Sequence, residues 1–327
     1  MTAPVPARDA GRKGGLTARR WWPWAVNAAK LAFFVLVAWL LVTQARTIAW
    51  REVWETVVSR PPRSLLLAAL LATASYALYG SFDLLGRHLT GHALPRRQVI
   101  EINLVCYAFN MNLGATVGGA GFRYRLYSRL GLDAATITHV VAATMLTNWI
   151  GYLLLGGLLF LLRPPALPPE WRIGAMGLQA FGAALLALAL AYLLLCAFAG
   201  GRRWHVRGYE ATTPTLRFAL LQLALSCTNW LLMAGMLYVL MAYRIAFTDV
   251  LGVLLLSAVA GLITHVPGGL GVLEAVFVAL LSDQMAKHDL LASVLLYRTF
   301  YYFVPLALAG CGYLAMEAHA RHAASPH

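Results

Sequence analysis

The chain has 327 residues, of which 60% are hydrophobic and only 12% are charged, and its mean hydropathy is +0.68. This composition excludes an ordinary soluble domain and predicts an all-α polytopic integral membrane protein. The net charge of +13 does not indicate nucleic-acid binding. The basic residues lie mainly in short loops between apolar runs, where they orient membrane spans.

The N-terminal region predicts a tail, a span and a surface helix. Residues 1–20 are polar and rich in arginine, so we expect a disordered cytoplasmic tail. The apolar run over 24–42 is too long for a signal-peptide core and predicts a retained first span. Over 46–63, apolar residues oppose charged residues on a helix, which predicts an amphipathic helix on the outer leaflet.

The rest of the first half predicts two spans around a broken segment. Full spans are expected at 64–85 and 134–162. Between them, an apolar helix over 99–113 leads into a glycine-rich stretch that ends in Gly118-Gly119-Ala120-Gly121. The exit from this stretch is strongly basic.

The second half repeats this plan. Spans are expected at 174–199, 216–241 and 290–316, and the apolar run over 250–281 is interrupted by Pro267, Gly268, Gly269 and Gly271. Proline removes a backbone donor and glycine favours bends, so one helix cannot continue through this stretch. Broken backbone at membrane depth is tolerated only where protein or a wet cavity covers it. The pattern therefore predicts a cavity beside Glu274.

A Gly-Gly-x-Gly pattern recurs at an offset of 150 residues and predicts two repeats, at about 24–163 and 174–318. Each repeat would contain three full spans and one re-entrant segment, so the repeats must be inverted and both termini cytoplasmic. The domain expected is a single transmembrane unit over 21–318, with 319–327 as a cytoplasmic tail. The alternative is eight ordinary spans that use glycine for tight packing, and the Gly-Gly-x-Gly in both halves, with a proline before the second, favours re-entrance.

Two strings carry a family resemblance. NLGATVGGAGFRYRLYSRLGL at 112–132 and THVPGGLGVLE at 264–274 resemble YbhN-like members of the lysylphosphatidylglycerol synthase transmembrane (flippase-like) region family. The resemblance extends over nearly the whole chain. It implies a bacterial inner-membrane protein related to the lipid-translocating part of the aminoacyl-phosphatidylglycerol enzymes. It does not imply the synthase reaction, so we expect no enzyme activity.

The charged residues within apolar runs are the main site candidates, because an ionisable group at the centre of a span costs roughly 2.5–3.5 kcal/mol. Glu274 is suited to cap the helix after Gly271, and a functional role is compatible with that. Arg298 is expected either to pair with Asp83 or Glu274 or to bind phosphate. Asp83 and Glu101 are expected near an interface. Residues of the basic exit, including Arg123, are expected to orient the spans, and His265 to hydrogen-bond the broken backbone.

Glycine turns that start half-helices expose backbone N–H groups and suit an anion such as a lipid phosphate. The sequence therefore predicts phospholipid translocation, with an anionic or zwitterionic head group bound between the two glycine stretches. The predicted head-group residues are Gly118, Gly119, Gly121, Arg123, Gly268, Gly269, Gly271, Glu274 and Arg298. The predicted supporting residues are Asp83, Glu101, His265 and Pro267.

The alternatives are a small-solute or ion transporter and a non-transporting scaffold for envelope assembly. No metal, nucleotide or redox cofactor is indicated, and the sequence contains no Walker motif. The four cysteines show no paired spacing and predict neither disulfides nor a zinc site. The sequence leaves open whether the chain forms a homo-oligomer.

Overall fold

A computed structural model describes residues 50–168, 174–206 and 209–324. The chain divides into two compact units, Met1–Ile48 and Ala49–His327, and the described residues belong to the second unit. The predicted tail over 1–20 and the predicted first span over 24–42 lie outside the described residues.

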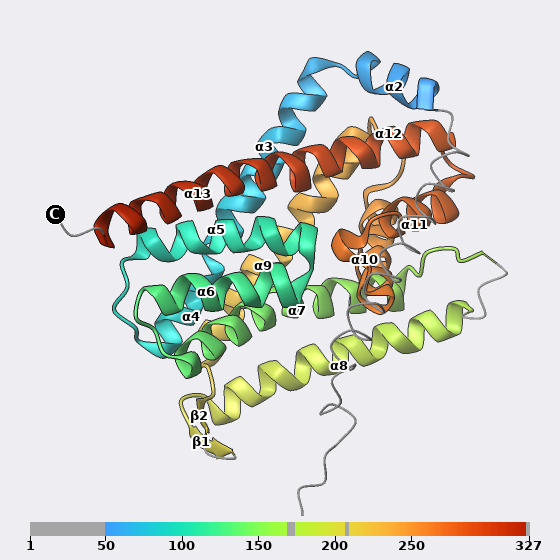
Figure 1. Cartoon of the computed structure of the whole chain (residues 1–327). Helices are drawn as coiled ribbons and strands as arrows, with labels where there is room; N and C mark the ends of the chain where they lie inside the picture. Colours follow the sequence, from blue (N-terminus) through green and yellow to red (C-terminus); the bar gives the residue numbers. More distant parts are fainter. Residues whose placement is uncertain (1–49, 169–173, 207–208, 325–327) are drawn as a thin grey trace, which may run out of the picture. The chain divides into compact units, whose positions relative to one another are not determined.

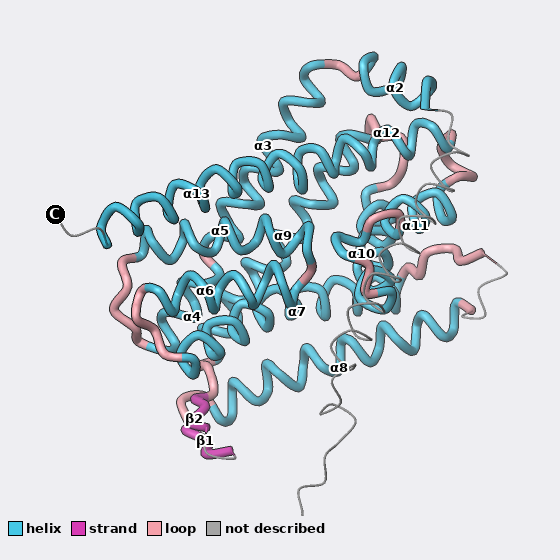
Figure 2. The backbone as a smooth tube through the Cα atoms, viewed as in Figure 1, coloured by secondary structure: helices cyan, strands magenta, loops and turns pink. Residues whose placement is uncertain are grey.

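The described residues are almost entirely helical (Figures 1 and 2). In chain order the elements are α2 (Trp50–Ser59), α3 (Pro62–Gly80), α4 (Phe82–Thr90), α5 (Arg96–Leu113), a π-helix (Ala115–Gly121), α6 (Phe122–Arg129), α7 (Ala134–Leu162), α8 (Ala175–Ala199), β1 (Arg203–Val206), β2 (Tyr209–Thr212), α9 (Leu216–Leu240), α10 (Phe247–Thr264), a 3₁₀ turn (Pro267–Gly269), α11 (Val272–Leu281), α12 (Lys287–Arg298), a second π-helix (Thr299–Phe303) and α13 (Val304–Ala324).

Six helical stretches of the described residues are long and apolar enough to cross a membrane, which confirms a polytopic membrane protein. Five of them correspond to predicted spans: Pro62–Thr90, Ala134–Leu162, Ala175–Ala199, Leu216–Leu240 and Lys287–Leu314. The sixth, Phe247–Thr264, is the first arm of the segment that was predicted to be broken.

Both predicted breaks are present, and at each one the chain folds back into a helical hairpin. In the first hairpin, α5 packs against the π-helix and α6, and in the second, α10 packs against α11 (Figure 1). Gly114 ends α5 with a φ of 83°, and His265, Gly268, Gly269 and Gly271 all have positive φ at the second bend. Re-entrance from opposite faces and the inverted repeat stay predictions.

The first glycine stretch is a wound π-helix rather than an open loop. Glycine is needed there for space, since a Cβ at Gly118 would lie 2.2 Å from the carbonyl oxygen of Phe109. The backbones of the two arms are therefore in direct contact. A similar approach joins α7 to α9, where a Cβ on Gly151 would lie 2.4 Å from Ser226 Oγ. Small residues at such crossings are typical of helices that pack within membranes.

Helix packing surrounds the two hairpins with long helices. α7 packs against α4, α8 and α9, and α3 packs along α9, while α13 lies beside α5 (Figure 1). Asp133 starts α7 by accepting a hydrogen bond from the backbone N–H of Thr136 at 2.9 Å. The link between α8 and α9, which was predicted as a plain loop, contains the antiparallel pair β1 and β2. Its Trp, Val, Tyr and Thr residues favour strands.

The predicted amphipathic segment contains α2, which is shorter than the range 46–63. Trp54 and Val58, one helical turn apart, are both 66% exposed. The other side of α2 packs against α12, and Arg60 donates to Ser293 Oγ at 3.1 Å. An exposed apolar face on a short charged helix fits a membrane surface, and the outer leaflet stays a prediction.

Candidate functional site

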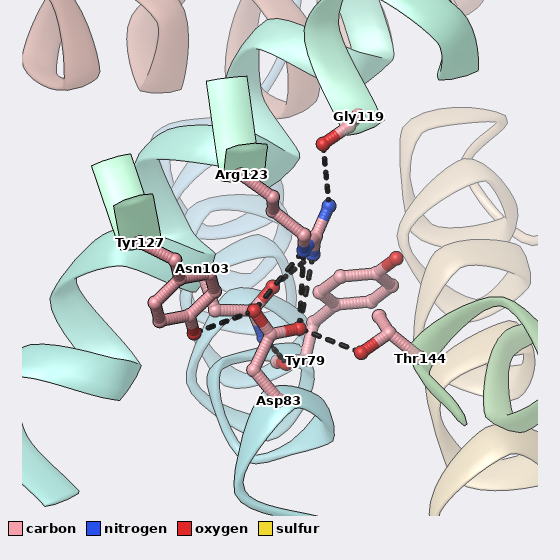
Figure 3. Close-up of polar contacts among 7 residues, drawn as sticks. All are labelled: Tyr79, Asp83, Asn103, Gly119, Arg123, Tyr127 and Thr144. Atoms are coloured by element: carbon pink, nitrogen blue, oxygen red, sulfur yellow. Dashed lines mark hydrogen bonds and ion pairs between the residues drawn. The ribbon is translucent and has the colours of Figure 1, made fainter. Parts of the chain in front are cut away.

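The first candidate site is a buried ion pair between α4 and α6 (Figure 3). Arg123 donates from Nε to Asp83 Oδ2 at 3.0 Å and from Nη2 to Oδ1 at 3.1 Å. Its Nη1 donates to the carbonyl of Gly119 at 3.1 Å, and Nη2 also reaches Asn103 Oδ1. Asp83 is 0% exposed and Arg123 is 4% exposed. Charges this deeply buried need such saturation to be tolerated.

Two hydroxyl groups complete the partners of Asp83. Tyr127 of α6 donates its hydroxyl to Oδ2 at 2.9 Å, and Thr144 of α7 donates to Oδ1 at 2.6 Å (Figure 3). Asn103 of α5 donates in turn to the carbonyl of Tyr79 at 2.6 Å. Asp83 is therefore enclosed by protein on all sides. The helical stretch continues past it to Thr90, and its expected position near a membrane interface stays a prediction.

The second candidate site is an ion pair beside the second bend. Arg298 donates from Nε and Nη2 to the two carboxylate oxygens of Glu274, the latter bond at 3.1 Å. Nη1 donates to the carbonyl of Gly268 at 2.9 Å and Nη2 to that of Gly269 at 2.6 Å. The guanidinium carbon lies 5.0 Å from the ring centre of Tyr302, within the range of a cation–π contact. Of the two pairings expected for Arg298, the structure has the one with Glu274.

Both arginines contact a glycine-rich stretch by the same chemistry. Each guanidinium donates to a glycine carbonyl, that of Gly119 in the π-helix or those of Gly268 and Gly269 in the 3₁₀ turn, while a carboxylate balances its charge. In both sites the carboxylate precedes the arginine in the chain. Asp83 and Arg123 lie on either side of the first bend, whereas Glu274 and Arg298 both follow the second bend.

The two bends meet. A Cβ on Gly268 would lie 3.0 Å from the carbonyl oxygen of Asn112, at the end of α5. The side chain of Asn112 also donates to the carbonyl of Tyr302 at 3.1 Å. The end of the first hairpin's leading arm therefore packs directly against the 3₁₀ turn of the second hairpin.

A cavity of about 200 Å³ lies beside this contact, lined by residues from both hairpins and from α7, α9 and α12. The wall combines aromatic and apolar side chains with a few neutral polar ones: Tyr107, Asn110, Met111, Asn148, Trp149, Trp230, Met233, Leu254, Ser257, Ala258, Gly261, Gly268, Gly269, Leu273, Tyr297 and Tyr302. A cavity is thus present at the second break, and Glu274 and Arg298 are not among its lining residues.

Tyr297 distinguishes this cavity from ordinary packing space. Its side chain is 0% exposed, and its hydroxyl has no hydrogen-bond partner within the part of the chain that the structure describes. Buried hydroxyls nearly always have a partner. A polar ligand or water in the cavity would supply one.

Five other predicted site residues lie in or beside the two glycine-rich stretches. Gly118 is buried and Gly121 is exposed, while Gly271 starts α11 in a left-handed conformation. Pro267 begins the 3₁₀ turn. His265 hydrogen-bonds the carbonyl of Ile263 at 2.9 Å, which confirms its predicted contact with the broken backbone.

Glu101 lies away from both bends. It pairs with Arg97 at 2.7 Å, and both side chains are substantially exposed.

Sequence reasoning missed several buried polar residues. Asn103 and Thr144 lie in apolar runs and contact the Arg123–Asp83 pair. A second cluster joins Ser75, Tyr107, Asn229 and Tyr301 through hydroxyl and amide bonds of 2.6–2.8 Å. Polar side chains at mid-span were the available signal. No group of three or more His, Cys, Asp or Glu that could hold a metal occurs among the described residues.

The loop after α4 places His92 over the first site. Its ring lies 6.2 Å from that of Tyr127. Burial, and next the positive charge of Arg87, lower the pKa of His92 below its usual value. The ring therefore favours the neutral form beside Arg87.

Comparison with known proteins places these features in a family. A family model described as the lysylphosphatidylglycerol synthase TM region matches residues 27–309. The inner membrane protein YbhN of Escherichia coli is 42% identical over 301 residues, which cover 92% of this chain and 95% of YbhN. A Synechocystis protein named as uncharacterized is 31% identical over 90% of this chain and 91% of its own length.

A more distant match is to an enzyme. The phosphatidylglycerol lysyltransferase of Staphylococcus haemolyticus is 28% identical over 222 residues, or 66% of this chain. The matched part is 25% of that enzyme, so the chain corresponds to about a quarter of its length.

Proposed function

Because the chain belongs to the family of the lysylphosphatidylglycerol synthase transmembrane region, we propose that it is an inner-membrane protein that moves phospholipid between the leaflets of the bilayer. YbhN is named as an inner membrane protein, and the Staphylococcus enzyme is named for phosphatidylglycerol. The family thus links the chain to phospholipid metabolism. The transfer reaction of the lysyltransferases is not carried over, since the match covers only about a quarter of that enzyme.

The observation that carries the proposal is the cavity where the two bends meet, whose largely apolar wall contains a few neutral polar side chains. It lies among helices that are apolar enough to span a membrane, and polar groups there are costly unless they are partnered or hydrated. Its volume of about 200 Å³ is below the roughly 300–1,000 Å³ of typical drug-sized pockets. Such a space suits a lipid head group, while the hydrocarbon chains would stay in the bilayer.

The charge pairs set the chemistry of head-group binding. Most donors of Arg298 are taken by Glu274 and by two glycine carbonyls, so a lipid phosphate would have to compete with Glu274 for the guanidinium. The first turn of α11 offers backbone N–H groups to an anion in the same region. Exchange of Glu274 for phosphate at Arg298 is the proposed binding step. Arg123 and Asp83 would hold the other bend in place.

The test uses purified protein in liposomes that contain a head-group-labelled phospholipid. The proposal predicts that an added quencher bleaches the inner-leaflet label faster with protein than in protein-free vesicles. Anionic and zwitterionic lipids are compared, each with and without an imposed ion gradient. Bleaching at the protein-free rate under every condition would defeat the proposal and leave the solute-transporter or scaffold alternatives.

A further inference from the structure

A second, larger cavity lies on the other side of the cluster formed by Ser75, Tyr107, Asn229 and Tyr301. It is a groove of about 580 Å³ between α3, α5 and the helix formed by the second π-helix and α13. Its lining residues are Ala69, Ala72, Thr73, Tyr76, Ala77, Glu101, Leu104, Val105, Phe300, Val304, Pro305, Leu308, Ala309 and Gly312. Both long walls, Pro62–Thr90 and Lys287–Leu314, are candidate membrane spans.

The groove offers almost no hydrogen-bonding group along its length. Thr73 Oγ1 donates to the carbonyl of Ala69 at 2.8 Å, and Tyr76 donates its hydroxyl to the carbonyl of Tyr301 at 2.9 Å. Glu101, the charged residue among those that line the groove, lies at one end beside the exposed Arg97. A wall of this kind, between membrane-spanning helices, matches a hydrocarbon chain and no polar ligand.

The dimensions fit one leaflet. From Phe300 to Gly312 the lining helix advances twelve residues, or about 18 Å at the α-helical rise. Half of a bilayer's hydrocarbon core is about 15 Å. Gly312 lies near Val105, so the Gly312 end of the groove is the one that faces Glu101. The other end reaches mid-span at Tyr76 and Phe300.

A thin tyrosine wall separates this inner end from the polar cavity. Tyr76 lines the groove and Tyr107 lines the cavity, and their rings are 5.0 Å apart. Tyr301 is fully buried against both rings and hydrogen-bonds the hydroxyl of Tyr107 at 2.8 Å. On the second π-helix, Phe300 lines the groove and Tyr302 lines the cavity. Single π-helical turns inside α-helices are frequent at functional sites.

We propose that this groove binds one hydrocarbon chain of a membrane phospholipid, with the polar end of the lipid beside Arg97 and Glu101 and the chain tip against the tyrosine wall. That the lipid in the groove is the same lipid whose head group enters the cavity rests on the proposed function. Binding of a hydrocarbon chain in the groove does not depend on the proposed function.

The test uses two phospholipids, one with a photoreactive group at the tip of one chain and one with the group near the head. Each is incorporated into vesicles with the full chain, and the labelled residues are mapped by mass spectrometry. The tip probe should label the Tyr76–Phe300 end, and the other probe the Glu101 end. Equal labelling of the exposed surface of α8, for example at Leu188, would reduce the groove to ordinary surface lipid and overturn the proposal.

A matched pair of variants sharpens the result. Ala77 lines the groove and Ala74 does not, and both are exposed residues of α3. Ala77→Trp should cause loss of groove labelling, and Ala74→Trp should leave it unchanged. Labelling that survives Ala77→Trp would contradict the proposal. A cross-link from a cysteine at Leu308 to residues 24–42 that excludes the lipid probe would also contradict it, since the chain itself would then fill the groove.

Groove labelling and transbilayer movement are measured in the same vesicles. Labelled groove residues without lipid movement would refute the proposed function and support the groove. Lipid movement without groove labelling would support the proposed function and refute binding of a hydrocarbon chain in the groove.

Discussion

Arg123 and Arg298 make similar contacts with the two glycine-rich stretches, each donating to a glycine carbonyl and to a carboxylate from another helix. The carboxylates are Asp83, from before the first bend, and Glu274, from after the second. The two hairpins thus reach the same local chemistry with the carboxylate on opposite sides of the bend. Charge pairing at the bends, rather than the exact position of each residue, is the shared feature.

The pair at the second bend predicts a specific coupling. Arg298→Leu should destabilise the protein by about 3–5 kcal/mol, because it leaves Glu274 partly buried without its partner. Adding Glu274→Gln should restore much of the lost stability, measured as the fraction that stays monodisperse after heating in detergent. Asp83→Asn in the same background serves as the control and should restore nothing. Equal, additive losses in both double variants would show that the Glu274 contact contributes little.

The ion pair of Arg123 and Asp83 predicts which of two substitutions costs more stability. Asp83→Asn strands the buried guanidinium of Arg123 and should cost about 3–5 kcal/mol. Tyr127→Phe removes one hydrogen bond to the carboxylate and should cost less, about 1.5–3 kcal/mol. The same heating assay measures both, and Asp83→Asn combined with Arg123→Gln should recover part of the loss. A Tyr127→Phe variant less stable than Asp83→Asn would argue against an ionised pair.

The first bend predicts a steric effect of one methyl group. Gly118→Ala places a Cβ on the Phe109 carbonyl and should cost about 1–3 kcal/mol through forced backbone movement. Gly310→Ala, in α13, meets no atom within 4 Å and should be neutral or stabilise by roughly 0.5–1 kcal/mol. Thermal unfolding of the two variants in detergent provides the comparison. Similar unfolding temperatures would mean that the arms of the first hairpin are looser than described.

The inverted arrangement predicts an asymmetric labelling pattern. Single cysteines at Ser128 and Asp283, both exposed, are introduced after the four native cysteines are replaced. In whole cells an impermeant thiol reagent should label the cysteine at 283 and leave that at 128 unlabelled until the cells are opened. Labelling of both from outside would exclude oppositely directed hairpins.

The sequence predicted the features that have strong local causes. Proline and clustered glycines at 267–271 cannot continue a helix, and the break is where they lie. The pair of Arg298 with Glu274 was one of two alternatives, since an arginine within a span needs a partner.

Other features depend on contacts between distant residues. The burial of Asp83 was not predicted, because the apolar run ends near it, and the helix continues through Arg87 and His88. The partners of Asp83 come from positions 40 to 61 residues away, and no spacing rule links them. No pattern in the sequence distinguishes the two π-helices from α-helix. The tyrosine wall forms only when α3, α5 and the second π-helix pack together.

The central claim is that a phospholipid head group crosses through the cavity where the bends meet, and filling that cavity tests it most directly. Ala258 lines the cavity, and Ala187 is an exposed residue of α8, so Ala258→Phe and Ala187→Phe form a matched pair. Both are reconstituted at equal density, and the rate at which a head-group-labelled phospholipid leaves the inner leaflet is measured by quenching. The account predicts that Ala187→Phe matches the wild-type rate while Ala258→Phe falls to the rate of protein-free vesicles. Wild-type movement through folded Ala258→Phe would contradict it.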